Sequence, residues 1–437
     1  MKKYKEILII FIPIIFQQLV MNIINIVDNF MVGRFSDTYI SAITIINRIF
    51  NVSNSLLLGL VASCAVFIAQ YNGTKDTYNA ESTFKFSILS SIGILLPMII
   101  VFIVFPEFII GFFTNDIDVI NAATIYIRLL SLSLIPYIVS QTISNAIRSI
   151  GIVKGPLYIS IIMVLVKIVL NYALLYNPLQ LELFGAGLAL IITRIIELSL
   201  LIIILEISNS GLSVRNFNKC KISSRLAIKV VKRMLPLGIN EFLYGIALAV
   251  MYKLYASYDT MILAGYSIAL TYYETFRVIN GSIGMTMNVF VLPLLSNDLY
   301  DKAKNKAYQI FVFGVKMAII IGVILFALSF TIPFIYNTSS VSINLATRLL
   351  KIMGLLFPFI TFHGLFYFIF RCGQDNKSII ITDSMYLLFI AIPIQYICIK
   401  NGFSIITTYL CTELSAIIKI IFCIYFIRKG NWQRNLT

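Results

Sequence analysis

The chain is dominated by apolar segments, each about as long as a lipid bilayer is thick. Hydrophobic residues make up 59% of its 437 residues and charged residues 12%, whereas soluble domains carry roughly 45–50% apolar and about 25% charged residues. A helix needs about 20 apolar residues to cross the hydrocarbon core. The sequence therefore predicts an all-α membrane protein with about 12 transmembrane helices, over 7–32, 41–70, 84–106, 121–146, 155–177, 184–207, 228–254, 262–293, 307–335, 343–370, 378–399 and 404–427.

Basic residues between these segments alternate strongly from loop to loop. One alternating set of loops and termini holds 22 Lys and Arg residues, and the other set holds only Arg34 and Lys400. Basic loops stay on the cytoplasmic side of a membrane. We therefore expect a multi-pass protein of the cell membrane with both termini in the cytoplasm. The net charge of +15 then reflects topology, and we expect no nucleic acid partner.

The two halves of the sequence repeat at an offset of 223 residues. Pro13 falls on Pro236, and Arg148 falls on Arg371. The repeat predicts two parallel six-helix lobes, related by a pseudo-two-fold axis along the membrane normal. The lobes are 1–207 and 228–437, joined by a basic cytoplasmic linker at 208–227. Transporters with such repeats bind substrate near the midplane between the halves and rock between two openings.

Several short motifs resemble the multidrug and toxic compound extrusion (MATE) family. The resemblance implies export of small organic compounds in exchange for protons or sodium ions, with no other cofactor, and we expect a monomer in the bilayer. The motifs are Ile26-Val-Asp-Asn-Phe-Met-Val-Gly33, Ala69-Gln-Tyr-Asn-Gly73, Arg148-Ser-Ile-Gly151, Leu170-Asn-Tyr and Gly185-Ala-Gly.

Asp28 is the strongest candidate for a coupling-ion or proton site. An ionisable residue inside a membrane span is costly and by default suggests function. It follows a polar stripe in an otherwise apolar helix, which we expect to line a substrate cavity. In the family, the matching aspartate helps to bind the coupling ion and is protonated during transport. A structural ion pair is the alternative. The stripe consists of Gln17, Gln18, Asn22 and Asn25.

Lys167 departs from the family pattern, which often has asparagine at this position. It lies four residues before Asn171, whose position is aspartate in some members, and Leu190 replaces a family threonine. We expect Lys167 to pair with Asp28. The ammonium then either substitutes permanently for the coupling cation or exchanges protons with the carboxylate, unless the pair is a static salt bridge.

In the second half, Glu241 is the candidate for an ion site. The family often has a glutamate about one turn further along, where this chain has Tyr244. Glu274 and Arg277 are spaced i, i+3, so they either bridge each other or face the substrate cavity. Arg194 and Glu197 repeat that spacing in the first half. The single histidine, His363, is expected to be a hydrogen-bonded core residue.

The balance of charges inside the spans does not determine whether the transported compound is cationic, anionic or zwitterionic. Apart from the basic residues at the cytoplasmic ends of the spans, ten basic residues are embedded in the membrane segments against about six acidic ones, which is unusual for an exporter of cations. A flippase for lipid-linked sugars is therefore the alternative function. The sequence contains no P-loop and no zinc-protease motif, and its loops are too short to hold an enzyme site, so we expect a secondary transporter and not an enzyme.

Reporter fusions test the predicted topology. A green fluorescent protein fused to the carboxyl terminus should fluoresce, and alkaline phosphatase fused there should be inactive, because the basic loops hold that end in the cytoplasm. Fusions after Asp116 should give the opposite pair of signals. Active phosphatase at both positions would contradict the predicted orientation.

Overall fold

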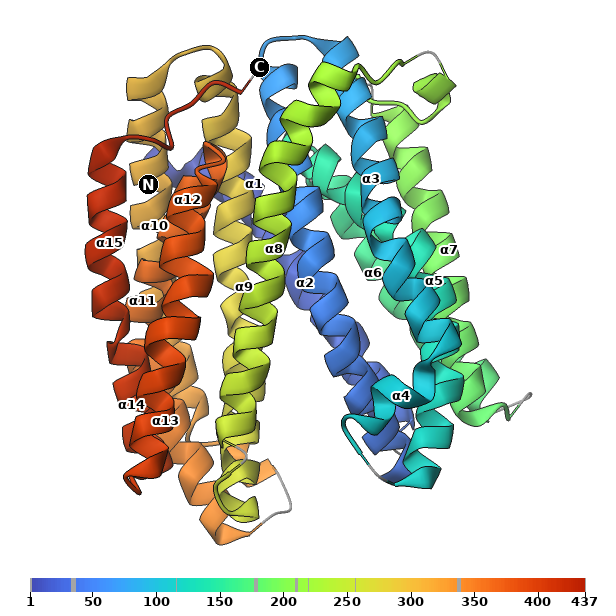
Figure 1. The fold of residues 1–437 in the computed structure, drawn as a ribbon, viewed down its shortest axis with the longest axis vertical. Coiled ribbons are helices and arrows are strands. Elements are labelled where there is room, and N and C mark those ends of the chain that lie inside the picture. Colours follow the sequence, from blue (N-terminus) through green and yellow to red (C-terminus); the bar gives the residue numbers. More distant parts are fainter. Residues whose placement is uncertain are drawn as a thin grey trace. The chain divides into compact units, whose positions relative to one another are not determined.

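The computed structural model shows helices joined by short loops (Figure 1). It describes the backbone of residues 2–32, 37–114, 116–176, 180–208, 211–218, 220–255, 257–335 and 339–436. It also describes the side chains within these ranges, apart from positions 2–3, 21–30, 32, 37–38, 40–41, 44, 48, 216, 218 and 260.

Eleven helical segments of the described part are long and apolar enough to cross a membrane. With α1, a helix of 31 residues, they match the predicted order of twelve, and the all-helical membrane fold is confirmed. The elements are α1 (Lys2–Val32), α2 (Asp37–Gly73), α3 (Thr77–Val104), α4 (Pro106–Gly111), α5 (Ile117–Ser149), α6 (Lys154–Asn171), η1 (Tyr172–Tyr176), α7 (Glu182–Ile207), η2 (Arg215–Asn218), α8 (Ser224–Tyr255), α9 (Thr260–Ser296), α10 (Tyr300–Leu328), η3 (Ile332–Ile335), α11 (Ser340–Cys372), α12 (Asn376–Ile380), η4 (Ile381–Met385), η5 (Leu387–Ala391), α13 (Ile392–Lys400), α14 (Ile405–Leu414) and α15 (Ala416–Lys429).

Polar caps determine where several of these helices begin. Asp76, Asp116, Asp259, Ser339 and Ser404 each accept a hydrogen bond from a backbone N–H in the first turn of the following helix. Such caps satisfy amides that have no partner within the helix. Each cap immediately precedes a spanning helix, so the loops between spans stay short.

The chain forms two compact units, and the boundaries fall inside the first helix of each sequence repeat. One unit contains residues 1–11 and 239–437, and the other contains residues 12–238. Pro13 and Pro236, which correspond in the repeat, lie within two residues of these boundaries. The first residues of each repeat therefore belong to the unit that is formed mainly by the other repeat. The predicted lobes, 1–207 and 228–437, follow the sequence repeat instead.

Contacts within each unit hold these leading segments. In the unit of residues 1–11 and 239–437, the rings of Tyr4 and Phe11 lie 5.8 and 5.2 Å from that of Phe313. In the other unit, the Met234 sulfur of α8 accepts a hydrogen bond of 3.5 Å from the Cys64 thiol. Prolines are tolerated within membrane helices where neighbouring groups satisfy the backbone positions that they leave open.

Two predicted spans are less regular than expected. The eleventh contains consecutive π-helical turns, η4 and η5, directly before Pro393. The last span, predicted as one helix over 404–427, is divided into α14 and α15 at Ser415. The Ser415 hydroxyl bonds to the Thr412 carbonyl at 2.6 Å and to the Tyr386 hydroxyl at 2.8 Å. These side-chain bonds compete with the regular helix ladder at the break.

The segment between the repeats packs on α3. Lys85 donates hydrogen bonds to the carbonyls of Phe217 and Cys220. The Cys220 thiol lies 3.1 Å from a carboxylate oxygen of Glu81. Burial raises the pKa of the Cys220 thiol to about 11, and Glu81 adds to this shift. The thiol is therefore protonated at neutral pH and is a poor nucleophile.

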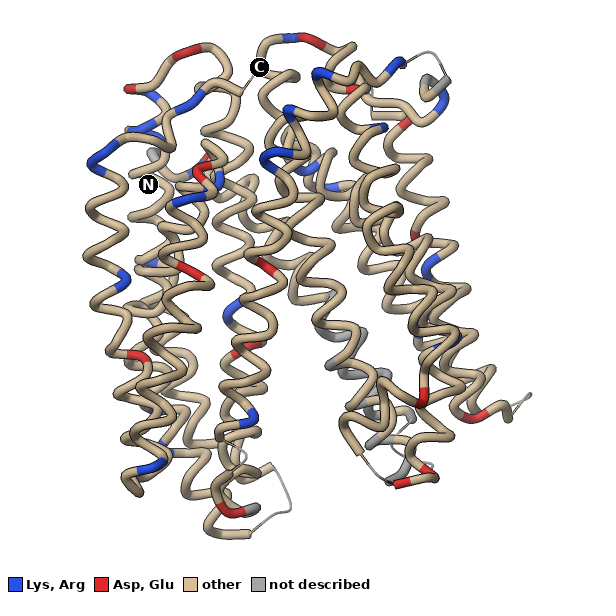
Figure 2. The backbone as a smooth tube through the Cα atoms, viewed as in Figure 1, with Lys and Arg blue, Asp and Glu red and all other residues tan. Residues whose placement is uncertain are grey.

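Charges gather at the ends of the helices. Figure 2 shows Lys and Arg concentrated at one end of each unit's bundle, and in the unit of residues 12–238 Asp and Glu are prominent at the other end. This concentration of basic residues matches the charge alternation in the sequence. A few charges lie along the helices themselves, and some of these belong to the candidate site.

Two glycines allow α10 and α11 to approach closely. A Cβ on Gly354 would lie 2.7 Å from the Gly322 carbonyl oxygen and 2.9 Å from the Phe326 backbone nitrogen. Both obstructing atoms belong to the backbone and cannot move aside without separating the helices. Small residues are typical of such crossings in membranes, because packing there replaces the hydrophobic effect.

Gly354→Ala should therefore destabilise the protein by about 1–3 kcal/mol, the usual cost of overpacking. Thermal unfolding in detergent measures the change. Gly93→Ala is the matched control, since a Cβ there meets nothing within 4 Å. Equal melting temperatures for the two variants would contradict the close approach.

Candidate functional site

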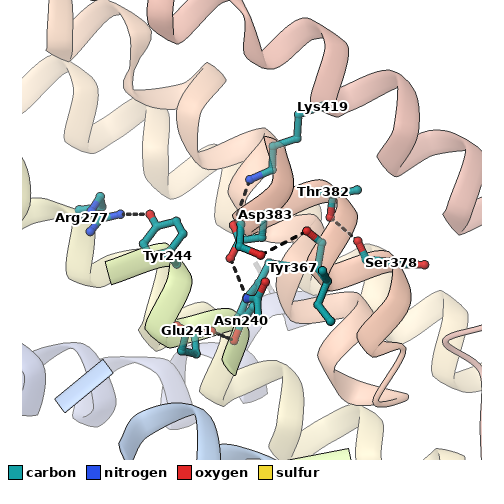
Figure 3. A network of polar contacts seen from close by, with 11 residues as sticks. Asn240, Glu241, Tyr244, Arg277, Tyr367, Ser378, Thr382, Asp383 and Lys419 are labelled. Atoms are coloured by element: carbon teal, nitrogen blue, oxygen red, sulfur yellow. Dashed lines mark hydrogen bonds and ion pairs between the residues drawn. The ribbon is translucent and has the colours of Figure 1, made fainter. Parts of the chain in front are cut away.

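A buried polar cluster lies within the unit of residues 1–11 and 239–437. Its side chains come from α8, α9, α11, α12, η4 and α15 (Figure 3). Most of the surrounding helix surface is apolar, so these groups depend on one another for hydrogen bonds and counter-charges. The labelled members are Asn240, Glu241, Tyr244, Arg277, Tyr367, Ser378, Thr382, Asp383 and Lys419.

Asp383 is the most highly connected member. The Lys419 ammonium lies 3.4 Å from Oδ1, with the two side chains 7% and 10% exposed. The Asn240 amide nitrogen donates to Oδ2 at 3.2 Å. Lys419 and Asn240 reach the carboxylate from two sides (Figure 3). Removing one partner of such a buried pair typically costs about 3–5 kcal/mol, so Asp383 and Lys419 depend on each other.

Glu241 follows Asn240 on α8 and faces α11. The Tyr367 hydroxyl donates a short hydrogen bond to its Oε1. The charges of Asp383, Arg371 and Arg277 are close enough to act on Glu241, and Arg371 also lies 5.9 Å from the centre of the Tyr367 ring. Glu241 thus lies among one acid and two bases, where gain or loss of a proton changes the local charge balance.

Arg277 links α8 to α9. Its Nε donates to Glu274 at 2.9 Å, and its Nη1 donates to the Tyr244 hydroxyl at 2.9 Å. The predicted i, i+3 bridge between Glu274 and Arg277 is confirmed. Tyr244, which stands where the resemblance expects a glutamate, is instead a hydrogen-bond acceptor for Arg277.

The other unit has its own buried polar residues. Lys167 is 1% exposed and Asn171 is fully buried, both on α6. Gln17 is also buried and accepts a hydrogen bond of 3.3 Å from Arg148, and Gln18 is half-buried. The side chains of Asn22, Asn25 and Asp28 lie outside the described part of the structure, so the expected pairing of Asp28 with Lys167 stays a prediction.

Arg194 and Glu197 on α7 form the second predicted bridge. Arg194 Nη1 lies 2.7 Å from the Glu197 carboxylate, and its guanidinium stacks 4.4 Å from the ring centre of Tyr137. Tyr137 in turn donates to Asn54 at 2.7 Å. This chain of contacts ties α7 to α5 and α2, which is a structural role.

His363 is buried, but the expected hydrogen bond is absent. Neither ring nitrogen has a partner among the described side chains, and the ring packs edge-on to Phe359 at 5.6 Å. The expectation was wrong in this respect because the surrounding α11 surface is aromatic. No group of three or more His, Cys, Asp or Glu that could hold a metal occurs in the described ranges.

Asp383 and Lys419, at the centre of the cluster, were not among the site residues predicted from the sequence. Asp383 and Lys419 were recognisable as embedded charges of opposite sign in consecutive spans. Tyr367 and Asn240 gave no such signal, since both are ordinary residues in membrane helices. Only the packing of α8, α11, η4 and α15 brings them together.

A family model named MatE matches residues 13–173 and 236–397. A probable multidrug resistance protein NorM from Oceanobacillus iheyensis is 22% identical over 79% of this chain and 78% of its own length. The multidrug resistance protein MdtK from Pectobacterium atrosepticum is 22% identical over 78% and 75%.

Solved structures show the same fold. The eukaryotic MATE transporter AtDTX14 superposes with a TM-score of 0.87 at 17% identity, covering 100% of this chain and 97% of that one. A MOP superfamily transporter from Pyrococcus furiosus gives 0.84 at 15% identity, covering 97% and 95%. The two matched segments of the family model correspond to the two sequence repeats and cover most of the chain. The chain therefore belongs to the MatE family of multi-pass membrane transporters.

Proposed function

We propose that this transporter exports small organic compounds from the cytoplasm in exchange for protons or sodium ions. The observation that carries the proposal is the cluster around Glu241 and Asp383, because it places two carboxylates inside membrane-spanning helices. A buried carboxylate that changes its charge can favour one arrangement of its neighbours over another. An antiporter needs such a group to respond to substrate and ion in opposition.

The proposed contribution of Glu241 is to take up and release a proton. Its carboxylate is held by the Tyr367 hydroxyl and lies within reach of the charges of Arg277 and Arg371. Protonation removes one negative charge from this group and leaves the two guanidinium groups less well compensated. We infer that this change favours release of substrate to the outside.

The proposed contribution of the other unit comes from Asp28, Lys167 and Asn171. Lys167 and Asn171 are both buried on α6. A buried lysine is retained in a membrane helix chiefly where its charge is compensated or used. The polar side chains of the substrate path are proposed to be those of the first-span stripe and of the Glu274–Arg277 pair. The stripe consists of Gln17, Gln18, Asn22 and Asn25.

Organic compounds are the proposed cargo because relatives such as NorM and MdtK are named as multidrug resistance proteins. The alternative, flipping of lipid-linked sugars, rested on the excess of embedded basic residues. Three of these, Arg194, Arg277 and Lys419, form ion pairs with acids of the same unit. Their charge is thus compensated within the protein, which favours the exporter over carriage of a pyrophosphate. We propose that it acts as a monomer.

Efflux from proteoliposomes, with pH and sodium gradients imposed separately, tests the function. Cationic and anionic fluorescent probes identify the charge of the cargo. Asp28→Asn and Glu241→Gln should each reduce gradient-driven efflux on the order of tenfold or more, a typical size for coupling between two sites. Glu107→Gln, at an exposed position, is the control and should leave efflux unchanged. Normal efflux by the Glu241→Gln protein would remove Glu241 from the mechanism.

A double-mutant cycle tests the link between Glu241 and Tyr367. Tyr367→Phe removes the hydroxyl that bonds to the carboxylate and should destabilise the protein by about 1–3 kcal/mol. In the Glu241→Gln background the same change should cost less, because the charged acceptor is already gone. Thermal unfolding gives all four values, with Tyr308→Phe as a control at an exposed tyrosine. Strictly additive losses would show that the two side chains do not interact.

A further inference from the structure

The Lys419 side chain places an ammonium group beside the buried carboxylate of Asp383. Its ammonium lies 3.4 Å from Asp383 and 5.6 Å from the ring centre of Tyr386. No other acid lies within ion-pair distance of it in the part of the chain that the structure describes. The ammonium is therefore compensated chiefly by one carboxylate.

Two local departures from regular helix bring the pair together. Asp383 is in the middle of the π-helical turn η4, and π-helical turns often occur at functional sites. Lys419 follows the break at Ser415, in the first turn of α15. The hydrogen bond between Tyr386 and Ser415 ties these two irregular regions to each other. The pairing is thus built into the backbone of both spans.

The groups around Asp383 are suited to a cation once the ammonium is removed. The carboxylate is contacted by nitrogen donors, Lys419 Nζ and Asn240 Nδ2, which cannot coordinate a metal ion. The Asn240 Oδ1 atom, however, is buried and has no hydrogen-bond partner among the described side chains. The amide now presents its nitrogen to Asp383, so it has to turn for Oδ1 to join the carboxylate. Carboxylate and carbonyl oxygens are ligands that suit hard metal cations.

There is also space beside the pair. A cavity of about 170 Å³ adjoins the Lys419 side chain and is lined by Ile381, Met385, Tyr386, Phe389, Ile390 and Phe422. Apart from the Tyr386 hydroxyl and Lys419 itself, these side chains are apolar. This space adjoins Lys419 among mainly apolar side chains, and Asp383 is not part of its lining.

We propose that the Lys419 ammonium takes the place of a free cation at Asp383 and thereby makes this carboxylate unresponsive to sodium ions. Lys419 is in this view a residue that determines ion specificity. Replacing it with an uncharged side chain should open a sodium site formed by Asp383 and Asn240. The inference rests on the proposed function and adds which ion the buried polar cluster around Asp383 excludes.

Sodium-dependent thermal stability of the purified protein tests the proposal. The comparison is between sodium chloride and choline chloride at equal ionic strength, for the wild type, Lys419→Met, Lys419→Arg and the double variant Lys419→Met/Asp383→Asn. Sodium should raise the melting temperature of Lys419→Met by about 3 °C relative to the double variant, the shift expected at roughly tenfold its Kd. The wild type and Lys419→Arg should show no more sodium response than the double variant.

Loss of a structural ion pair alone would lower the melting temperature of Lys419→Met equally in both salts, and that result would overturn the proposal. A sodium response in the wild type that Asp383→Asn abolishes would overturn it as well. If Lys419→Met does not fold, Lys419→Gln replaces it, because its amide can still donate to Asp383 without a charge. Lys419→Gln should then show the same sodium-specific rise, and its absence would refute the idea.

The measurement is made at equilibrium and needs no transport. Normal efflux by Glu241→Gln would therefore refute the proposed coupling role without affecting this inference. A missing sodium response in the Lys419 variants would refute the inference and leave the export function standing.

Discussion

Inside a bilayer no water is available to satisfy a polar group, so a polar group that finds no partner in the protein is costly. The backbone meets this demand by forming helices, which explains why the described chain is helical almost throughout. Side chains meet it in pairs and clusters. Arg194 bonds to Glu197, Arg277 to Glu274 and Tyr244, and Lys419 to Asp383. The same constraint makes any change of charge in these groups consequential for their neighbours.

The two repeats share a scaffold but not its polar chemistry. Asn240 and Glu241 fall at the repeat positions of Gln17 and Gln18, whereas Asp383 falls on Ser160 and Lys419 on Ile196. Both units nevertheless bury a lysine, Lys167 on α6 and Lys419 on α15. A buried lysine is thus common to both units but lies at a different place in each.

Parts of the candidate site could be predicted from spacing alone. The bridges at 194 and 197 and at 274 and 277 follow from helix geometry, because residues three apart share a face. Glu241 was identified as an acid in an apolar span. The contacts of Asp383 with Lys419 and Asn240 join residues 36 and 143 positions apart, and no local pattern encodes such distances. The hydrogen bond from Tyr367 to Glu241 could not be predicted either, because these residues are also far apart in the sequence.

The bilayer environment, the helical class, the order of the spans and the repeat could all be predicted from the sequence, because length, hydropathy and loop charge act locally along the chain. The division of the compact units near Pro13 and Pro236, and the contact of Asp383 with Lys419 through η4 and the break at Ser415, became visible only in the folded chain. These features arise from packing between helices. That packing depends on the shapes of surfaces distant in sequence, as in the approach of Gly322 to Gly354.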